Sequence, residues 1–172
     1  NVIQLNTAQK SLRVEQVKAI IVQHLSKLRR FAYSLTQNMH DADDLVQLVV
    51  ERMLNNPMPE SVEPLAWLFR VCKNAWVDEL RFRAVRKQAD STEMDNLEQP
   101  ENSESALNQL AQRDLHRAID QLPEVYAMVL KLIVVSGLSY AEVAQTLDIP
   151  LGTVMSRISR AREQLADKLR TE

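Results

Sequence analysis

The chain has 172 residues, of which 45% are apolar, so it can bury the core of one medium-sized domain or two small ones. A net charge of −2 excludes a uniformly basic nucleic-acid-binding protein, and the single cysteine excludes an internal disulfide. Because no apolar run reaches the length of a membrane span, we expect no membrane insertion. With only two glycines and many helix-forming residues, the composition predicts an all-α protein. We expect Cys72 to be a buried apolar residue and the protein to be cytoplasmic.

Three helices are predicted in the first part of the chain. Residues 14–37 carry apolar side chains at helical spacing. A second helix is predicted from near Asp41, a good N-cap, to about Leu54. The stretch NNPMPESVEP at 55–64 contains three prolines and predicts a loop. Pro64 suits the first turn of a third helix that runs to about Gln88, so residues 14–88 form a first unit.

An acidic segment separates this unit from a second one. Residues 89–105 contain six acids, no base and few large apolar residues, which is typical of a flexible linker. The second unit, residues 106–172, has predicted helices at 106–120, 122–135, 138–148 and from about 151 onward. The strongly apolar helix at 122–135 is its expected core. The sequence therefore predicts two small helical domains joined by an acidic linker.

The last two predicted helices have the order and length of a helix-turn-helix. Ser139 and Glu142 stand at capping-box spacing, and Asp148, Ile149 and Pro150 form a short turn before the last helix. An ordinary αα-hairpin is the alternative interpretation.

A helical projection of the last helix separates a buried stripe from a face suited to DNA. The stripe consists of Val154, Ile158, Ala161 and Leu165. The DNA-contacting candidates are Thr153, Met155, Ser156, Arg157, Ser159, Arg160 and Arg162. Arg160 can form a fork to guanine, Met155 can only contact a thymine methyl or fill space, and Arg157 and Arg162 are placed for phosphates. The alternative is a solvated face with ion pairs to Glu163, but no acid occurs from 152 to 162.

The third predicted helix is apolar around most of its circumference, so we expect it to be buried on most sides. One narrow polar stripe contains Arg70, Asn74, Asp78 and Arg81, and an ion pair is the plain interpretation of the last two. The amide of Asn74 suits a base edge. From Trp67 to Gln88 six bases face two acids, a net charge of +4 that suits a DNA backbone. The candidates here are Arg70, Lys73, Asn74, Arg81, Arg83 and Arg86, whereas the aromatic side chains are expected in the core.

The second predicted helix has an acidic face made of Asp43, Asp44, Gln47 and Glu51. Its opposite, inward face consists of Ala42, Leu45, Val49 and Met53. Acidic side chains repel DNA, so this face either is simply solvated or binds a protein partner.

Three stretches resemble the bacterial extracytoplasmic-function (group IV) sigma factors of RNA polymerase. They are DADDLVQ at 41–47, WLFRVCKNAWVDELRFRAVRK at 67–87 and LSYAEVAQTLDIPLGTVMSRISRAR at 138–162. The resemblance covers roughly Lys18 to Leu169. It implies a sigma-2 domain that reads and melts the −10 promoter element, and a sigma-4 domain that reads the −35 element. It also implies that the acidic linker threads through the polymerase toward the RNA exit channel.

The resemblance also implies partners and residue roles. The partners are core RNA polymerase, through its β′ clamp and β flap, promoter DNA and an anti-sigma factor, with a monomer expected when free. Asp44 and Gln47 match the segment that docks on the clamp. Asn74 matches the pocket for a flipped-out base, and Ser156 and Arg160 match major-groove contacts.

The chain departs from the family pattern in two places that affect promoter preference. Many members carry a basic residue where this chain has Met155, and the 55–64 loop lacks the aromatic residue that some relatives place near the flipped base. A sigma mimic that sequesters an anti-sigma factor, and a helix-turn-helix repressor, are the alternative functions. An enzyme, a cofactor and a metal site are not expected, because the three histidines are scattered and no nucleotide-binding loop or metal-ligand spacing occurs.

Overall fold

The computed structural model describes residues 2–89 and 114–171, and every regular element within these two ranges is a helix. The all-α prediction is therefore confirmed. Most of the predicted linker and the first residues of the helix predicted at 106–120 lie outside the described residues. The remainder of that helix, 114–120, is helical. Within the described ranges, none of the helices combines the length and the apolar character that a membrane span requires.

Helix α1 runs from Val2 to Thr36 and so begins well before Val14, where the sequence analysis placed its start. The earlier residues contain neither glycine nor proline, and nothing in them stops a helix. The helix ends at Gln37, whose φ of 56° is left-handed and whose N–H donates to the Tyr33 carbonyl at 2.8 Å.

Helix α2 spans Met39–Asn55, and the prediction of Asp41 as its N-cap was wrong. Asn38 is the cap, because its side chain accepts a hydrogen bond from the Asp41 N–H at 3.1 Å. Asp41 lies instead in the first turn, where its charge suits the helix dipole. The predicted inward residues Ala42, Leu45, Val49 and Met53 are all buried.

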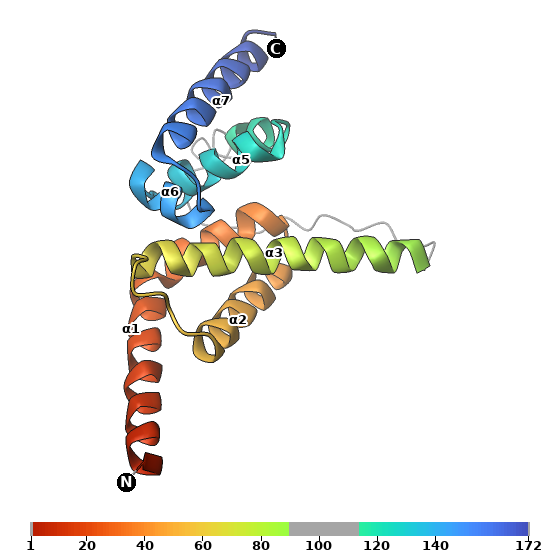
Figure 1. Cartoon of the computed structure of the whole chain (residues 1–172). Coiled ribbons are helices and arrows are strands. Elements are labelled where there is room, and N and C mark those ends of the chain that lie inside the picture. The colour runs from red at the N-terminus through yellow and green to blue at the C-terminus, as the bar shows by residue number, and fades with distance from the viewer. Residues whose placement is uncertain (1, 90–113, 172) are drawn as a thin grey trace.

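Helix α3 spans Pro64–Ala89, and the loop predicted before it is confirmed. Its first half is core: Leu68, Phe69 and Cys72 are fully buried. Its second half projects beyond α1 and α2 (Figure 1), and Leu80, Phe82 and Val85 are 41%, 53% and 66% exposed. The expectation that this helix is buried on most sides was therefore wrong for its second half, because no described element covers that half.

The second unit contains the short helix at 114–120, α5 (Glu124–Leu130), α6 (Tyr140–Leu147) and α7 (Leu151–Thr171). Helix α5 continues into a π-helical segment, η1 (Lys131–Val135), which ends at Gly137 with a φ of 69°. The burial of Val129, Leu130 and Leu132 confirms that this region is the core of the unit.

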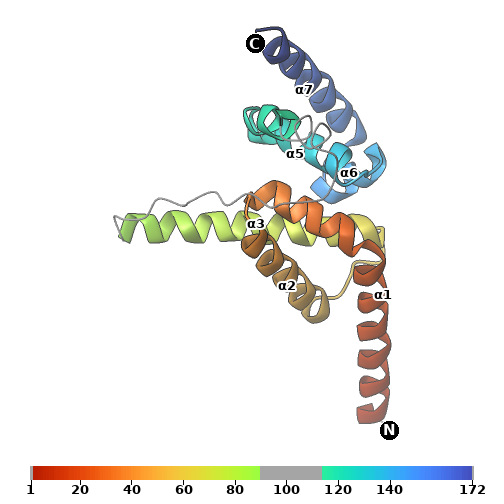
Figure 2. The same cartoon turned by 180° about the vertical axis from the view of Figure 1, so that it is seen from behind.

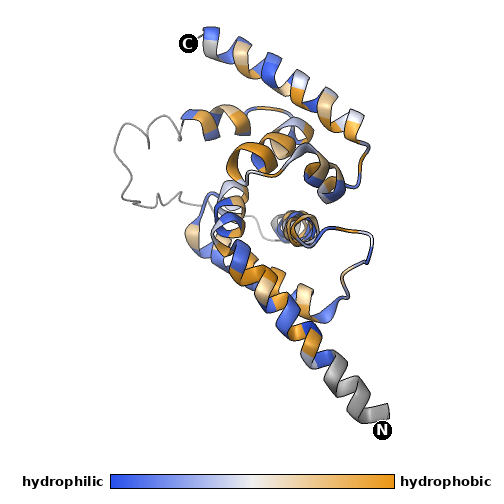
Figure 3. Cartoon of the chain, turned by 90° about the vertical axis from the view of Figure 1, so that its left-hand side faces the viewer, coloured by the Kyte–Doolittle hydropathy of each residue, from blue (hydrophilic) through white to orange (hydrophobic). Residues whose placement is uncertain are grey.

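The two units pack directly against each other. Helix α6 lies against the first half of α3, and η1 lies against α1 (Figures 1 and 2). Hydrophobic and hydrophilic segments alternate along the helices of both units (Figure 3). One hydrophobic cluster contains Phe31 and Phe69 from the first unit together with Val129, Val143 and Val154 from the second. The units consequently share a single main core, and a smaller cluster lies around Ile119 and Leu122.

Candidate nucleic-acid and protein interfaces

A helix-turn-helix is formed by α6 and α7, as the spacing predicts. Both bonds of the capping box are present: the Ser139 hydroxyl accepts from the Glu142 N–H at 3.2 Å, and the Ser139 N–H donates to the Glu142 carboxylate at 2.7 Å. Helix α6 ends at Asp148, which adopts a left-handed φ of 55°. Aspartate tolerates this conformation better than most residues, so the turn needs no glycine here.

Helix α7 buries the predicted stripe and exposes the opposite face. Val154, Ile158 and Ala161 are buried, and Leu165 is half-buried. Of the seven candidate DNA contacts, five are exposed and Thr153 and Arg157 are half-buried; the exposed ones are Met155, Ser156, Ser159, Arg160 and Arg162. A single helix therefore brings five of the seven to one open side, with Thr153 and Arg157 at its margin.

Two tyrosines, rather than Glu163, flank the arginines of this face. Arg162 donates to the Tyr140 hydroxyl at 3.3 Å. A hydrogen bond to the Tyr126 side chain is the main cause that raises the pKa of Arg160, with a smaller contribution from Glu163. Neither arginine forms an ion pair with Glu163 among the described residues. The arginines thus keep donors available on opposite edges of the helix.

On α3, two of the six candidate DNA contacts, Arg70 and Arg83, form hydrogen bonds that tie them to other parts of the protein. Arg70 donates to the Gln145 carbonyl through both Nε, at 3.2 Å, and Nη2, and its guanidinium stacks 5.9 Å from the Trp67 ring centre. Arg83 pairs with Glu79 and Asp41, each at 2.9 Å, and the two hydrogen bonds raise the pKa of Arg83.

Lys73, a further candidate on α3, is half-buried. Burial is the main cause that lowers the pKa of Lys73, and the neighbouring charge of Arg70 adds to the effect.

The other three candidates on α3 are solvent-exposed. They are Asn74, near the middle of the helix, and Arg81 and Arg86, on its projecting second half. Arg86 lies over the exposed Phe82 ring at 4.4 Å. Asp78 makes the expected pair with Arg81 at 3.9 Å but lies closer to Arg52, at 2.8 Å. Because Asp78 is shared, Arg81 remains open to an external partner.

The four residues of the predicted acidic face of α2 differ in exposure and in their contacts. Asp43 accepts two hydrogen bonds from Arg29 of α1, at 3.0 and 3.1 Å, and is half-buried. Asp44, Gln47 and Glu51 are exposed. These three residues therefore form the open part of the predicted protein-binding face, and Asp43 anchors the helix to α1.

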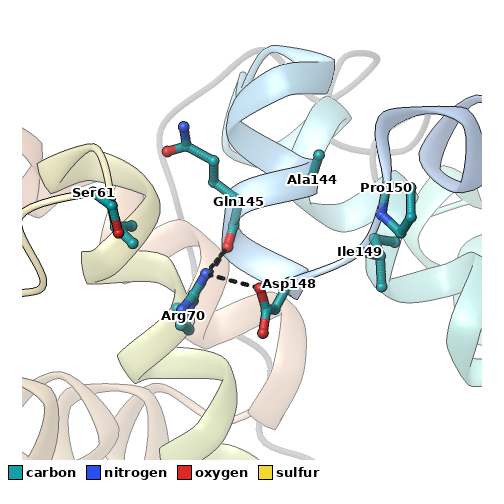
Figure 4. A pocket seen from close by; sticks show the side chains of 8 residues that line it. Ser61, Arg70, Ala144, Gln145, Asp148, Ile149 and Pro150 are labelled. Atoms are coloured by element: carbon teal, nitrogen blue, oxygen red, sulfur yellow. Dashed lines mark hydrogen bonds and ion pairs between the residues drawn. The ribbon is translucent and has the colours of Figure 1, made fainter.

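A cleft of about 470 Å³ lies between the two units, beside the Arg70 contact (Figure 4). Arg70 lies 3.8 Å from the Asp148 carboxylate at the turn of the helix-turn-helix. The Glu63 N–H donates to the Gln145 side chain at 3.0 Å, and the buried Thr146 hydroxyl donates to the Ala66 carbonyl at 3.3 Å. The helix dipole of α6 also favours the positive charge of Arg70 at the carboxyl end of this helix.

A second polar contact joins the units on the other side of the core. Lys131 donates to the Ser34 carbonyl at 2.7 Å and pairs with Asp120 at 2.7 Å. Asp120 also accepts from the Gln37 side chain at 3.1 Å. These contacts link α1 to both the 114–120 helix and η1.

Sequence reasoning missed Tyr126, Tyr140 and Arg29, and it missed the role of Arg70 between the units. The capping box places Tyr140 in the first turn of α6, but spacing does not show that its side chain meets α7. The partners of Arg29 and Arg70 are distant in the sequence, so no local pattern indicates them. The described residues contain no cluster of potential metal ligands.

The chain matches two family models. Residues 20–86 match sigma-70 region 2, and residues 112–165 match sigma-70 region 4. It is 36% identical over 156 residues to the ECF RNA polymerase sigma factor SigE of Mycolicibacterium smegmatis, covering 87% of this chain and 60% of that protein. It is 32% identical to the ECF RNA polymerase sigma factor EcfG of Rhodopseudomonas palustris, covering 85% of this chain and 81% of that protein.

The fold has a counterpart among solved structures. The sigma factor RpoE of Bartonella quintana, crystallised with the anti-sigma factor NepR, superposes with a TM-score of 0.74 and 27% identity over 92% of this chain and 99% of that chain. The matches to both sigma-70 regions, the presence of the helix-turn-helix and the similarity to these relatives all indicate the same family. The chain belongs to the extracytoplasmic-function (ECF) sigma factors of the sigma-70 family of RNA polymerase sigma factors.

Proposed function

We propose that this sigma factor binds core RNA polymerase and directs it to promoters by reading the −35 element with α7 and the −10 element with α3. The open face of α7 carries the proposal. It presents Ser156, Ser159 and Arg160 to solvent on a helix that is buried along its other side, with no acid from 152 to 162. Such a face fits the major groove, where side chains reach base edges and flanking cations reach phosphates.

We assign the −10 contact to α3, from Asn74 near its middle to its projecting end. Asn74 has two donors and one acceptor and is exposed, which suits a base taken out of the stack. Arg81 and Arg86 continue the same helix toward its free end and suit the adjacent backbone. Arg70 and Arg83 contribute to DNA binding only if their present hydrogen bonds break, and the half-buried Lys73 contributes only if it becomes more exposed.

We assign polymerase binding to both units. The exposed Asp44, Gln47 and Glu51 on α2 are the proposed contacts with the β′ clamp. The sigma-4 unit is the proposed contact with the β flap. The role is one of binding rather than catalysis, and it places the protein in the cytoplasm with the polymerase. With a net charge of −2, the free chain is expected to bind DNA weakly, so promoter recognition depends on the polymerase.

We further propose that an anti-sigma factor binds this chain. The superposition on RpoE, which was crystallised with NepR, supports this, because it covers nearly all of both sigma chains. Adding a purified anti-sigma protein is expected to abolish promoter-directed initiation by the holoenzyme. A candidate that binds the free chain but leaves initiation unchanged would not be its inhibitor.

The decisive experiment is transcription in vitro from a genomic library with core polymerase, followed by mapping of RNA 5′ ends. We expect a set of start sites that share −35 and −10 sequences and that disappear when this protein is omitted. Failure to initiate at any site would overturn the proposal and favour the sigma mimic. Specific, tight binding of the free chain to a promoter duplex at physiological salt would favour the repressor.

A further inference from the structure

Two apolar side chains stand exposed on the DNA-facing helix without any described element covering them. Leu151, the first residue of α7, is 47% exposed, and Met155, one turn later, is 55% exposed. Residues four apart lie on the same side of a helix, so the two form a continuous apolar edge. Arg162, seven residues beyond Met155, continues this edge and bonds to Tyr140 at the start of α6.

We propose that Leu151 and Met155 select thymine in the −35 element by contacting its methyl groups; this inference rests on the proposed function. The thymine C5-methyl is the apolar group that base pairs present in the major groove. Residues at the beginning of a recognition helix are the ones that reach base edges, and Leu151 and Met155 lie in the first two turns. Leucine and methionine have no donor, so a guanine at this place would leave its acceptors without partners.

The neighbouring polar side chains strengthen this assignment. The Ser156 hydroxyl donates to the Thr153 carbonyl at 3.0 Å, so its proton is used within the helix and its oxygen can only accept. Arg162 is held by Tyr140 at the rim of the edge. Arg160, the exposed arginine whose fork suits guanine, lies next to Tyr126 on the opposite edge of α7. Thymine and guanine are thus expected to be read by opposite edges of one helix.

The test uses promoters mapped with the wild-type holoenzyme, in which each −35 thymine is replaced in turn by deoxyuridine. Uracil keeps every hydrogen-bonding group of thymine and lacks only the methyl, so the substitution measures the methyl contact alone. At one or two thymines we expect initiation at limiting holoenzyme to fall about fourfold, the ratio that the loss of one buried methyl gives. The Met155→Ala and Leu151→Ala holoenzymes should have lost this sensitivity, and Met155→Leu should retain it.

Val22→Ala is the control, because it truncates an exposed apolar side chain on α1, far from α7 in the sequence, and it should keep the wild-type sensitivity. If no −35 thymine is sensitive to loss of its methyl, or if Met155→Ala is as sensitive as wild type, the inference is overturned while the proposed function stands. If the alanine variants instead weaken binding of core polymerase, the edge is a protein contact and the inference is equally overturned. Absence of initiation from every promoter would contradict the proposed function itself.

Discussion

Arg160 and Arg157 lie on the same helix but differ in what they can reach. Arg160 is exposed on the open face beside Tyr126, whereas Arg157 is half-buried at its margin. Arg160→Ala is expected to relax discrimination at one −35 base pair by about 1–3 kcal/mol, because a bidentate contact to a base is lost. Arg157→Ala should weaken initiation uniformly across promoters and reduce the slope of affinity against salt by about one. Initiation rates on all single-base variants of one promoter measure the discrimination, and the affinity of the holoenzyme for that promoter over a series of salt concentrations measures the slope.

A uniform loss for Arg160→Ala would contradict its assignment to a base and make it a phosphate contact. The control Tyr126→Phe removes the hydroxyl that hydrogen-bonds to Arg160 and leaves the ring in place. We expect it to reduce discrimination at the same base pair less than Arg160→Ala does, because the guanidinium remains but is less well positioned.

At the scale of one helix, two neighbouring aspartates of α2 have different expected roles, one in binding the polymerase and one in stability. Asp44 is exposed, whereas Asp43 is fixed by two hydrogen bonds from Arg29. Asp44→Lys is expected to weaken binding of core polymerase strongly and to leave the thermal unfolding midpoint nearly unchanged. Asp43→Asn should lower the free energy of unfolding by up to about 1 kcal/mol, the range of an exposed ion pair. Fluorescence titration with core polymerase and calorimetry distinguish the two, and equal polymerase affinity for Asp44→Lys and wild type would remove α2 from the interface.

The capping box gives a prediction for α6 that concerns stability. Ser139 and Glu142 satisfy each other's backbone N–H groups at the start of an eight-residue helix. Ser139→Ala should therefore lower the free energy of unfolding by about 1 kcal/mol, as the loss of an N-cap does in other proteins. Chemical denaturation measures this value, and Ser139→Asp, which restores a capping oxygen, is the control that should recover most of it. No loss in the alanine variant would show that tertiary contacts alone hold α6.

These elements also show how far the sequence can be interpreted by itself. The helix-turn-helix was predictable because the signals for it, the Ser139–Glu142 spacing and the apolar period of α7, are local. The free second half of α3 was not, because Leu80 and Phe82 have the same apolar character whether or not a neighbour covers them. The interface partners of Arg70 were also not predictable, since Gln145 is far along the chain and its backbone carbonyl is the acceptor.

At the scale of the whole molecule, two histidines near the contact between the units make stability depend on pH. Burial lowers the pKa of His116, which lies near Asp120 and Lys131, and burial also lowers the pKa of His24, which lies near Lys27 and Glu142. A histidine with a lowered pKa stabilises the folded state in its neutral form, so this stabilisation is complete above about pH 6.5 and is lost as the pH falls through the folded-state pKa. The unfolding midpoint is expected to decrease between pH 7.5 and 5.5.

Calorimetry at a series of pH values tests this dependence. The double variant His24→Gln and His116→Gln should show a smaller decrease, and the exposed His40→Gln is the matched control that should behave as wild type. An unchanged pH dependence in the double variant would assign the decrease to other groups.

The packed arrangement and the proposed promoter contacts cannot hold at the same time. The −35 and −10 positions are about 25 base pairs apart, which is roughly 85 Å of duplex at about 3.4 Å per pair. In the structure α6 lies against α3, and Arg70 is bound to the carboxyl end of α6. Reading both elements therefore requires the two units to separate, and the separation would also release Arg70 on the −10 side.

Energy transfer between dyes on Ser26→Cys in α1 and Ala166→Cys in α7 measures this separation, since Cys72 is buried and does not react. We expect high transfer in the free protein and low transfer in the holoenzyme on a promoter. Arg70→Ala combined with Lys131→Ala removes polar contacts on both sides of the shared core and should lower transfer in the free protein, because the apolar contact alone must then hold the units together. Arg81→Ala, which removes an equally charged side chain whose ion pair is with Asp78 of its own helix, should leave transfer unchanged. High transfer in the promoter-bound holoenzyme would show that one unit alone contacts its element.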